Sequence, residues 1–181
     1  MDRAPDRGRP QAILLDAAAP FERSAAWLRN HGWWHALPHF VSSGIPLIAL
    51  DGAGHLLVEG SEEAPREHGM GLVPGLARRY RPGGRGIHVG WCPVREVVRH
   101  PSIPDPQGVW LHVRHAYALE CDGSTLWDCP CGDPFSMLSA RGRVLLCQAQ
   151  LAQSGSSGRW MLQRLLTAVG AETSRTPETR S

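Results

Sequence analysis

Three residues between positions 90 and 132 have the side chains of a thiol-dependent hydrolase. Cys92 stands before a proline in "GWCP", His115 lies in the strand-like run "VWLHVRHAYALE", and Asp128 follows in "TLWDCP". A cysteine becomes a strong nucleophile when an imidazole removes its proton and a third group orients that imidazole. The three residue types therefore point to attack on an amide or thioester bond.

The spacing around Asp122-Gly123 predicts how the histidine and the aspartate meet. An Asp-Gly pair between two apolar runs is typical of a two-residue hairpin turn. In the resulting register Tyr117 pairs with Asp128, which places Asp128 diagonal to His115 on one strand face, about 7–8 Å away between backbones. We expect the carboxylate to hold the Nδ1 proton of His115 and leave Nε2 as a base.

The residues after Cys92 predict a short helix. Val94, Val97 and Val98 in "PVREVVRH" have helical spacing, and proline is tolerated in a first turn. The unpaired N–H groups and the dipole at a helix start favour a thiolate. Cys92 is therefore expected at the beginning of this helix, activated by its position.

These segments resemble the papain-like and transglutaminase-like cysteine hydrolases. "HAYALECDGSTLWDCP" is similar to their "HAW…dG…W…DPT" pattern, and "GWC" to their nucleophile turn, most of all in the compact versions of phage and mobile-element proteins. Over residues 90–130 the resemblance implies Cys92 as nucleophile, His115 as base and Asp128 as orienter. The oxyanion would be held by backbone N–H groups, with His88 as a further candidate.

Two other interpretations of the same residues remain open. His115 and Asp128 can form a purely structural pair, with Cys92 as a small buried apolar group. Alternatively, a zinc ion could be held by cysteines together with His112 or His115. The alternative zinc ligands are Cys121, Cys129, Cys131 and Cys147.

The segment "RRYRPGGRG" is a candidate binding loop. Its arginines could contact phosphate groups, and its tyrosine could stack on a base. The residues concerned are Arg78, Arg79, Tyr80, Arg81 and Arg85. The formal net charge of only +2 provides no general attraction to nucleic acid. A non-enzymatic binding module, with a protein or nucleic-acid partner, is thus the alternative function.

The chain length and composition predict one α+β domain. With 181 residues, we expect a disordered tail at 1–10, a domain at 11–170 and a loose tail at 171–181. Neither a signal peptide nor a membrane-spanning run is recognised, so a cytoplasmic protein acting on an unknown protein or peptide is expected. No cofactor is implied.

The apolar patterns predict a mostly antiparallel sheet of two hairpins, with helices before and after it. "IPLIALDGAGHLLVEG" predicts a hairpin turning at residues 51–54, and "VWLHVRHAYALE" with "TLWDCP", residues 109–130, predicts the second. A helix is expected from about Pro20 to Asn30. "MLSARGRVLLCQAQLAQ" and "GRWMLQRLLTAVG" predict two C-terminal helices separated by "SGSSG".

We predict that the purified protein carries no stoichiometric zinc. The C-x-C spacing of Cys129 and Cys131 is unlike the C-x2-C pairs that hold one tetrahedral ion. Elemental analysis is the measurement. One zinc per chain, lost when either cysteine is replaced by serine, would contradict the prediction.

Overall fold

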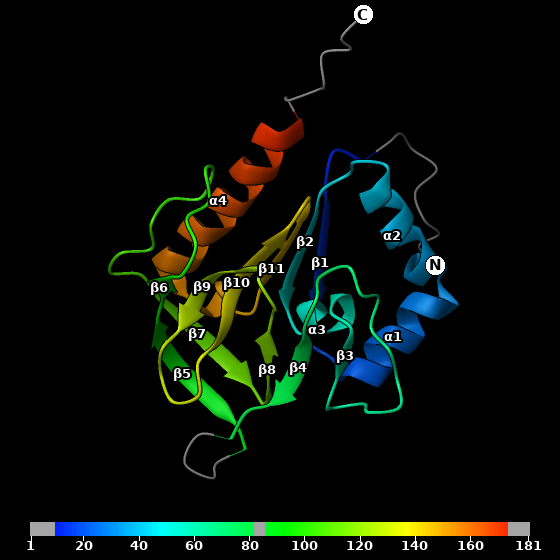
Figure 1. The fold of residues 1–181 in the computed structure, drawn as a ribbon, viewed down its shortest axis with the longest axis horizontal. Coiled ribbons are helices and arrows are strands. Elements are labelled where there is room, and N and C mark those ends of the chain that lie inside the picture. The colour runs from blue at the N-terminus through cyan, green and yellow to red at the C-terminus, as the bar shows by residue number, and fades with distance from the viewer. Residues whose placement is uncertain (1–9, 82–85, 174–181) are drawn as a thin grey trace, which may run out of the picture.

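A mixed six-stranded sheet forms the centre of the computed structural model, which describes residues 10–81 and 86–173 (Figure 1). The strand order is β1-β2-β11-β10-β9-β6. β1, β2 and β11 are mutually parallel, whereas β10, β9 and β6 join as antiparallel neighbours. The strands are β1 (Ile13–Ala17), β2 (Leu47–Asp51), β6 (Arg95–Glu96), β9 (Thr125–Cys129), β10 (Phe135–Arg141) and β11 (Val144–Cys147).

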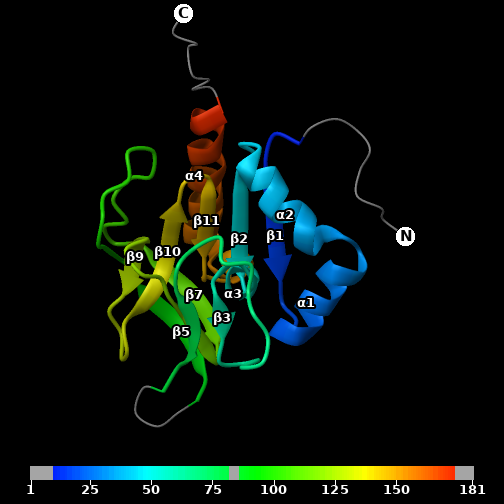
Figure 2. The ribbon, with the colours of Figure 1, turned by 45° about the vertical axis from the view of Figure 1, so that its right-hand side comes forward.

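The remaining elements cover the two faces of this sheet. Helices α1 (Phe21–Asn30) and α2 (Trp33–Ser42) connect β1 to β2, and α4 (Gly155–Thr173) follows the 3-10 turn η2 (Leu151–Gln153). Figure 2 shows α4 behind the sheet and α1 and α2 beyond its β1 edge. Short helix α3 (Ala53–Leu57) follows β2 directly. Among the described residues, no helix has the length and apolar character that crossing a membrane requires.

Two smaller sheets complete the domain. One has the order β3-β4-β8, and the other is a two-stranded ribbon of β5 and β7. Their strands are β3 (Gly60–Ser61), β4 (Leu76–Arg79), β5 (His88–Pro93), β7 (Trp110–His115) and β8 (Tyr117–Glu120). β7 therefore belongs to the ribbon and β8 to the other small sheet, because the chain changes sheets at Ala116.

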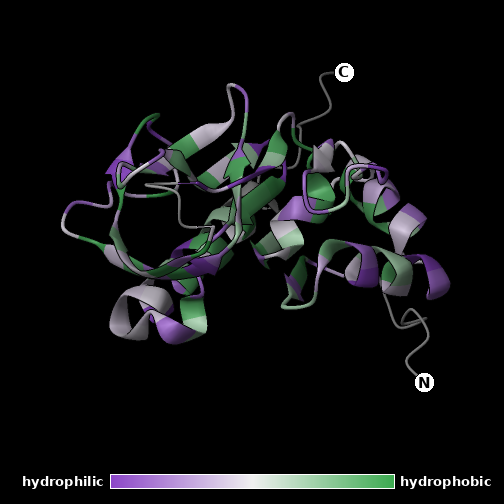
Figure 3. Ribbon diagram, turned by 90° about the horizontal axis from the view of Figure 1, so that it is seen from below, coloured by the Kyte–Doolittle hydropathy of each residue, from purple (hydrophilic) through white to green (hydrophobic). Residues whose placement is uncertain are grey.

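Alternation along the central strands divides the core into two clusters. Ile48 and Leu50 of β2 pack with α4 and the ribbon, whereas Leu47 and Ala49 pack with α1 and α3. β11 alternates in the same way. Because both faces of these strands are covered, they are continuously apolar, and Figure 3 shows the hydrophobic colour concentrated in the central strands while the outer helices are mixed.

The structure confirms some expected elements and corrects others. The helix expected from Pro20 to Asn30 is α1, and "GRWMLQRLLTAVG" lies in α4. The segment "MLSARGRVLLCQAQLAQ", expected to be helical, instead contains strands β10 and β11. The sheet is mixed rather than mostly antiparallel, because β1 and β11 flank β2 in parallel.

Both predicted hairpins are wrong. Residues 45–60 form a strand, a sharp turn and a helix. The prediction failed because Ala53–Leu57 are all buried, and a fully buried run shows no periodicity that distinguishes a strand from a helix. The second fails because β8 pairs with β4 and β9 pairs with β10. The Asp122-Gly123 turn exists, with φ 63° at Gly123, but it passes the chain from one sheet to another.

The expected termini fall partly outside the described residues. Positions 1–9 of the predicted N-terminal tail and positions 174–181 of the predicted C-terminal tail lie there. The C-terminal boundary expected at residue 171 is passed by α4, which runs to Thr173.

Candidate active site

A strand-to-helix turn at Asp51 has the geometry of a nucleophile elbow. Asp51 ends β2, Gly52 follows, and α3 begins at Ala53. Within residues 10–81 and 86–173, Asp51 is the one non-glycine residue with positive φ, at 50°. A Cβ on Gly52 would lie 2.8 Å from the carbonyl oxygen of Ala17, so the turn requires glycine there. This conformation projects the side chain at the tip of the turn towards a ligand.

The neighbouring strand β11 ends at the level of Asp51 and is followed by two glutamines, of which Gln150 contacts Asp51. Cys147 pairs with Leu50, so Gln148 follows at the level of Asp51. Gln150 Nε2 donates a hydrogen bond to Asp51 Oδ2 at 3.2 Å. Burial raises the pKa of the Asp51 carboxyl, and the hydrogen bond from Gln150 opposes that rise. The carboxyl ends of parallel strands are where α/β folds bind ligands.

A cavity of about 370 Å³ opens over this turn. Asp51 and Gly52 line it from the elbow, and β7 and β8 contribute the opposite wall. Its other polar lining residues include His55, Glu63, Arg114, His115, Tyr117 and Gln150. The Glu63 carboxylate accepts the backbone N–H of Phe21 at 3.1 Å, which fixes the start of α1 against the cavity. The site is therefore polar and large enough for a small ligand.

Gln148 has a buried side chain whose amide orientation is determined by its partners. Its Oε1 accepts the backbone N–H of Leu119 at 2.8 Å, so its Nε2 must be the donor end. That nitrogen donates to His115 Nδ1 at 2.7 Å and to the carbonyl oxygen of Tyr117 at 2.8 Å. Its two hydrogens match these two short contacts, and His55 Nε2 lies further away at 3.4 Å.

The orientation of Gln148 also determines the tautomers of two histidines. Burial lowers the pKa of His115 to about 3, with help from His88 and His55, and burial also lowers the pKa of His88. Neutral His115 accepts at Nδ1, so its proton is on Nε2, which donates to His88 Nδ1 at 3.1 Å. His88 then carries its proton on Nε2, 3.4 Å from Cys92 Sγ. A directed chain of donors thus ends at the Cys92 sulfur.

The structure connects Cys92 with His115 but separates both from Asp128. His88, not His115, contacts Cys92. The Asp128 carboxylate is bound by both Nε and Nη2 of Arg95, the Nε contact being 3.0 Å, across the β6–β9 pair. The expected orienting role of Asp128 is therefore wrong, because β8 and β9 lie in different sheets, and Gln148 occupies that role towards His115.

The predicted helix after Cys92 is also absent from the structure. Cys92 lies within β5, paired with Leu111, and Val94 follows this strand rather than starting a helical turn. Cys92 is completely buried. Its environment is therefore that of a strand residue facing the core, without the dipole of a helix start.

The alternative zinc ligands are distributed over the fold. Cys129 and Cys131 end or follow β9, Cys147 lies on β11, and Cys121 follows β8. The described residues include no group of three or more His, Cys, Asp or Glu side chains arranged to hold a metal ion. The zinc content of the protein stays a prediction.

The arginine-rich segment does not form the expected stacking surface. Arg78 binds Glu120 at 2.7 Å and Glu62 at 3.4 Å, and Arg79 donates its backbone N–H to Glu62. Tyr80 is only 4% exposed, and its ring stacks on His88, so a nucleic-acid base cannot reach it. Arg81 is exposed beyond β4, and Arg85 lies outside the described residues.

The elbow residue Asp51 and the neighbouring residues Gln148 and Gln150 were not predicted from the sequence. One local signal was available, because "ALDGAG" places small residues on both sides of Asp51, as a tight strand-to-helix turn requires. Gln148 and Gln150 carry no such signal. Gln150 reaches Asp51 only because β11 pairs with β2.

Comparison with solved structures identifies the fold class. The chain resembles a structure described as "Crystal structure of glutamine amidotransferase", with a TM-score of 0.59, 13% sequence identity, and coverage of 86% of this chain and 79% of that one. This likeness establishes a glutamine amidotransferase fold. The papain-like and transglutaminase-like resemblance is corrected accordingly.

Sequence comparison identifies the family within that class. The chain is 32% identical over 172 residues to imidazole glycerol phosphate synthase subunit HisH of Synechococcus sp. (strain CC9605), covering 89% of this chain and 79% of the relative. It is 35% identical over 164 residues to the HisH subunit of Desulfitobacterium hafniense (strain Y51), covering 84% of this chain and 74% of the relative. No family model matches the chain. The chain belongs to the HisH family.

We predict that burial of His55 makes folding sensitive to acid. Burial lowers the pKa of His55 to about 4 from 6.5. Between these two pH values the unfolded chain binds the proton more readily, so stability is full above pH 6.5 and falls as the pH drops towards 4. The loss from this residue should reach about 2–3 kcal/mol at pH 4.

Denaturant unfolding of the wild type and the His55→Gln variant at pH 7 and pH 4 measures this loss. The difference in unfolding free energy between the two proteins should shift in favour of the variant at pH 4. Parallel pH curves for both proteins would contradict the assignment to His55.

Proposed function

We propose that this chain is an amidotransferase-family subunit that binds a small ligand at the Asp51 elbow without cleaving glutamine there. The observation that carries the proposal is the identity of the elbow residue. The solved structure that the chain resembles is described as a glutamine amidotransferase. Cleavage of an amide by covalent catalysis requires a nucleophile such as a thiol. In this chain the strand-to-helix turn presents Asp51, and all five cysteines lie elsewhere.

The residues beside Asp51 support the loss of hydrolysis. An amide such as that of Gln148 is not protonated near neutral pH, so it cannot replace a histidine as general base. Its hydrogen-bonding atoms are already committed to Leu119, His115 and Tyr117. Gln150 is uncharged and cannot stabilise an imidazolium as a glutamate would. The turn therefore presents no thiol, and the two glutamines supply neither a general base nor an orienting carboxylate.

The same geometry supports retained binding. The cavity stays open, with the Asp51 carboxylate at its base and Arg114 on its wall. The hydrogen bond from Gln150 keeps the Asp51 side chain directed along the strand ends. A positive φ at a non-glycine residue is maintained only where the surrounding structure demands it, although aspartate tolerates it better than most residues.

We predict that the wild-type chain releases no ammonia from glutamine above the blank rate. The triple variant Asp51→Cys, Gln148→His, Gln150→Glu should gain measurable release, because it restores a thiol, a base and an orienting carboxylate at the ends of β2 and β11. Ammonia release with glutamine as substrate is the measurement, and thermal melting confirms that each variant is folded.

A matched variant isolates the thiol. Asp51→Asn with the same two glutamine changes has the base and the carboxylate but no nucleophile, and should stay at the blank rate. Wild-type hydrolysis abolished by Asp51→Asn, or by Cys92→Ser, would overturn the proposal and assign the chemistry to that residue.

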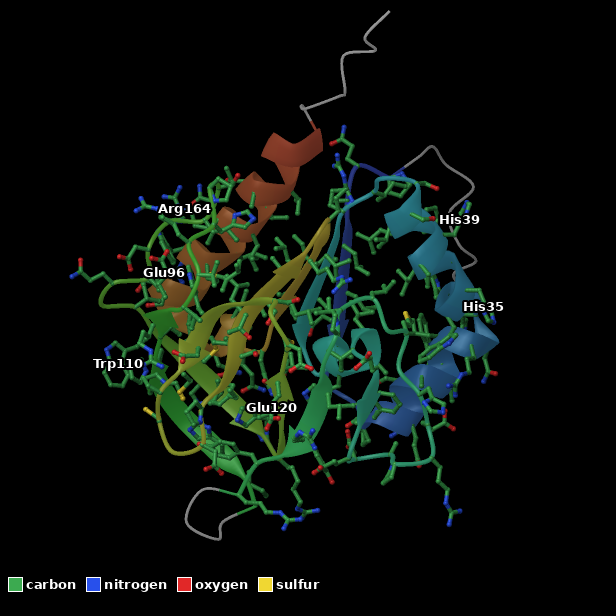
Figure 4. All side chains as sticks on the ribbon, in the orientation of Figure 1. His35, His39, Glu96, Trp110, Glu120 and Arg164 are labelled. Atoms are coloured by element: carbon green, nitrogen blue, oxygen red, sulfur yellow. The ribbon has the colours of Figure 1, made fainter. Side chains whose placement is uncertain are left out.

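An exposed apolar face supports docking on a protein partner. Val89 and Trp91 of β5 and Trp110 of β7 are 59%, 52% and 50% exposed. The register puts Pro93 beside Trp110 and Trp91 beside His112, so these side chains share the outer face of the ribbon. Figure 4 shows Trp110 at the outer margin of the molecule. We propose that a protein subunit covers this face, since the relatives are named as subunits of a synthase.

We predict that Trp91→Ala weakens association with the second subunit of imidazole glycerol phosphate synthase by at least about tenfold, because central tryptophans dominate interface energies. Trp27→Ala is the matched control: Trp27 is 53% exposed, but it lies on α1 and stacks on His31. Calorimetric titration measures both. Absence of wild-type binding, or an equal loss in both variants, would contradict the docking face.

A further inference from the structure

A second reactive centre lies inside the ribbon, apart from the Asp51 elbow. Cys92 faces the core from β5, and His88 of the same strand directs its Nε2–H at the sulfur over 3.4 Å. The direction of this hydrogen bond follows from Gln148, through His115 and His88, as derived above. A sulfur that accepts hydrogen bonds is stabilised as a thiolate.

A second sulfur contacts Cys92. Cys129, at the end of β9 and completely buried, belongs to the same core cluster as Cys92, and the two thiols interact electrostatically. The interaction with Cys129 lowers the pKa of the Cys92 thiol against the opposing effect of burial, and the interaction with Cys92 raises the pKa of the Cys129 thiol. The two thiols thus have opposite tendencies to ionise, and Cys92 also receives the N–H of His88.

A third sulfur connects this pair to the surface. Cys131 is only partly buried and hydrogen-bonds with Cys129. Tyr80 closes the other side, with its hydroxyl donating to the carbonyl oxygen of Cys131 at 2.9 Å and its ring stacked on His88. The complete burial of Cys92 and Cys129 excludes a bulky substrate, and of the three cysteines only Cys131 is partly exposed.

We propose that Cys92 and Cys129 form a reversible disulfide when the protein meets hydrogen peroxide, with Cys92 as the sulfur that reacts first. The Cys92 thiolate attacks one peroxide oxygen, the O–O bond breaks, and hydroxide leaves as Cys92 becomes a sulfenic acid. The Cys129 sulfur then displaces the sulfenic oxygen, which leaves as water with the Cys129 proton. Two thiols and one peroxide give one disulfide and two waters.

The other two cysteines lack the features on which this chemistry depends. Cys121 lies in a different cluster of the core, and burial raises its thiol pKa. Burial raises the pKa of Cys147 to about 12. Neither has a histidine contact in the hydrogen-bond network around Gln148. They provide internal controls for a difference in reactivity that is due to environment.

The disulfide would link the ribbon to the main sheet. Cys92 belongs to β5 and Cys129 to β9, which lie in separate sheets. The inner face of β5 carries the thiol, and its outer face carries Trp91. Oxidation would therefore fix the position of the apolar ribbon face. The thiol chemistry itself does not depend on the proposed elbow function or on a partner.

The test is peroxide oxidation of the reduced full-length chain, followed by alkylation of the remaining thiols and peptide mapping without reductant. The expected product is a peptide pair joined through Cys92 and Cys129, released by dithiothreitol, with Cys121 and Cys147 still alkylated. Oxidation confined to Cys131, a Cys129–Cys131 product, or no cross-link would overturn the proposal.

Variants of His88 separate a directing role from simple packing. His88→Leu removes the donor and should slow cross-linking by about tenfold or more, because less of Cys92 is thiolate. His88→Gln keeps an N–H donor and should recover most of the rate. Cys121→Ser should react like the wild type. Equal rates in His88→Leu and the wild type, with both folded by circular dichroism, would remove His88 from the mechanism and contradict the proposal.

Discussion

The side-chain amide of Gln148 joins the main sheet to the two smaller sheets. Its oxygen accepts from Leu119 of β8, and its nitrogen donates to His115 of β7 and to the carbonyl of Tyr117. A buried amide left without partners costs several kilocalories per mole, so these contacts are required once Gln148 is buried. The fixed direction of this amide then determines the proton positions on His115 and His88. One buried polar residue thus contacts both β7 and β8 next to the point where the chain changes sheets. It also determines which ring nitrogens of His115 and His88 carry protons.

The elbow at Asp51 has a backbone geometry that is separable from the side chain at its tip. The sharp turn, the glycine after it and the parallel pairing of β2 with β11 are all present. These features depend on backbone geometry and on packing of small residues, and they do not depend on which side chain occupies the tip. Function, in contrast, depends on the identity of that side chain and its neighbours. The proposed binding site uses this backbone with a carboxylate at the tip and Gln150 beside it.

The β5–β7 ribbon has two faces with opposite chemistry. Alternation along β5 points His88 and Cys92 inward and Val89 and Trp91 outward. The inner face is a network of hydrogen-bonded sulfur and nitrogen atoms, and the outer face is apolar and exposed. Since the two faces share one backbone, a change in the bonding of the inner sulfurs acts on the segment that carries the exposed tryptophan.

The sequence by itself determined the features that depend on local spacing. The helical period at residues 20–30 predicted α1, and the apolar period after residue 158 predicted the C-terminal helix. The residue types also pointed to thiol chemistry with Cys92 and His115, and the structure connects these two through His88. The tertiary structure alone decided the rest. An Asp-Gly turn fixes a change of chain direction but does not specify which strand the next one pairs with. Asp128 therefore binds Arg95 across the β6–β9 pair and does not contact His115. Parallel strands that are buried on both faces show no alternation of polar and apolar residues, so the end of β2 and the elbow after it could not be predicted from the sequence pattern. Gln150 reaches Asp51 through a pairing of β2 with β11 across about a hundred residues, which no local pattern specifies.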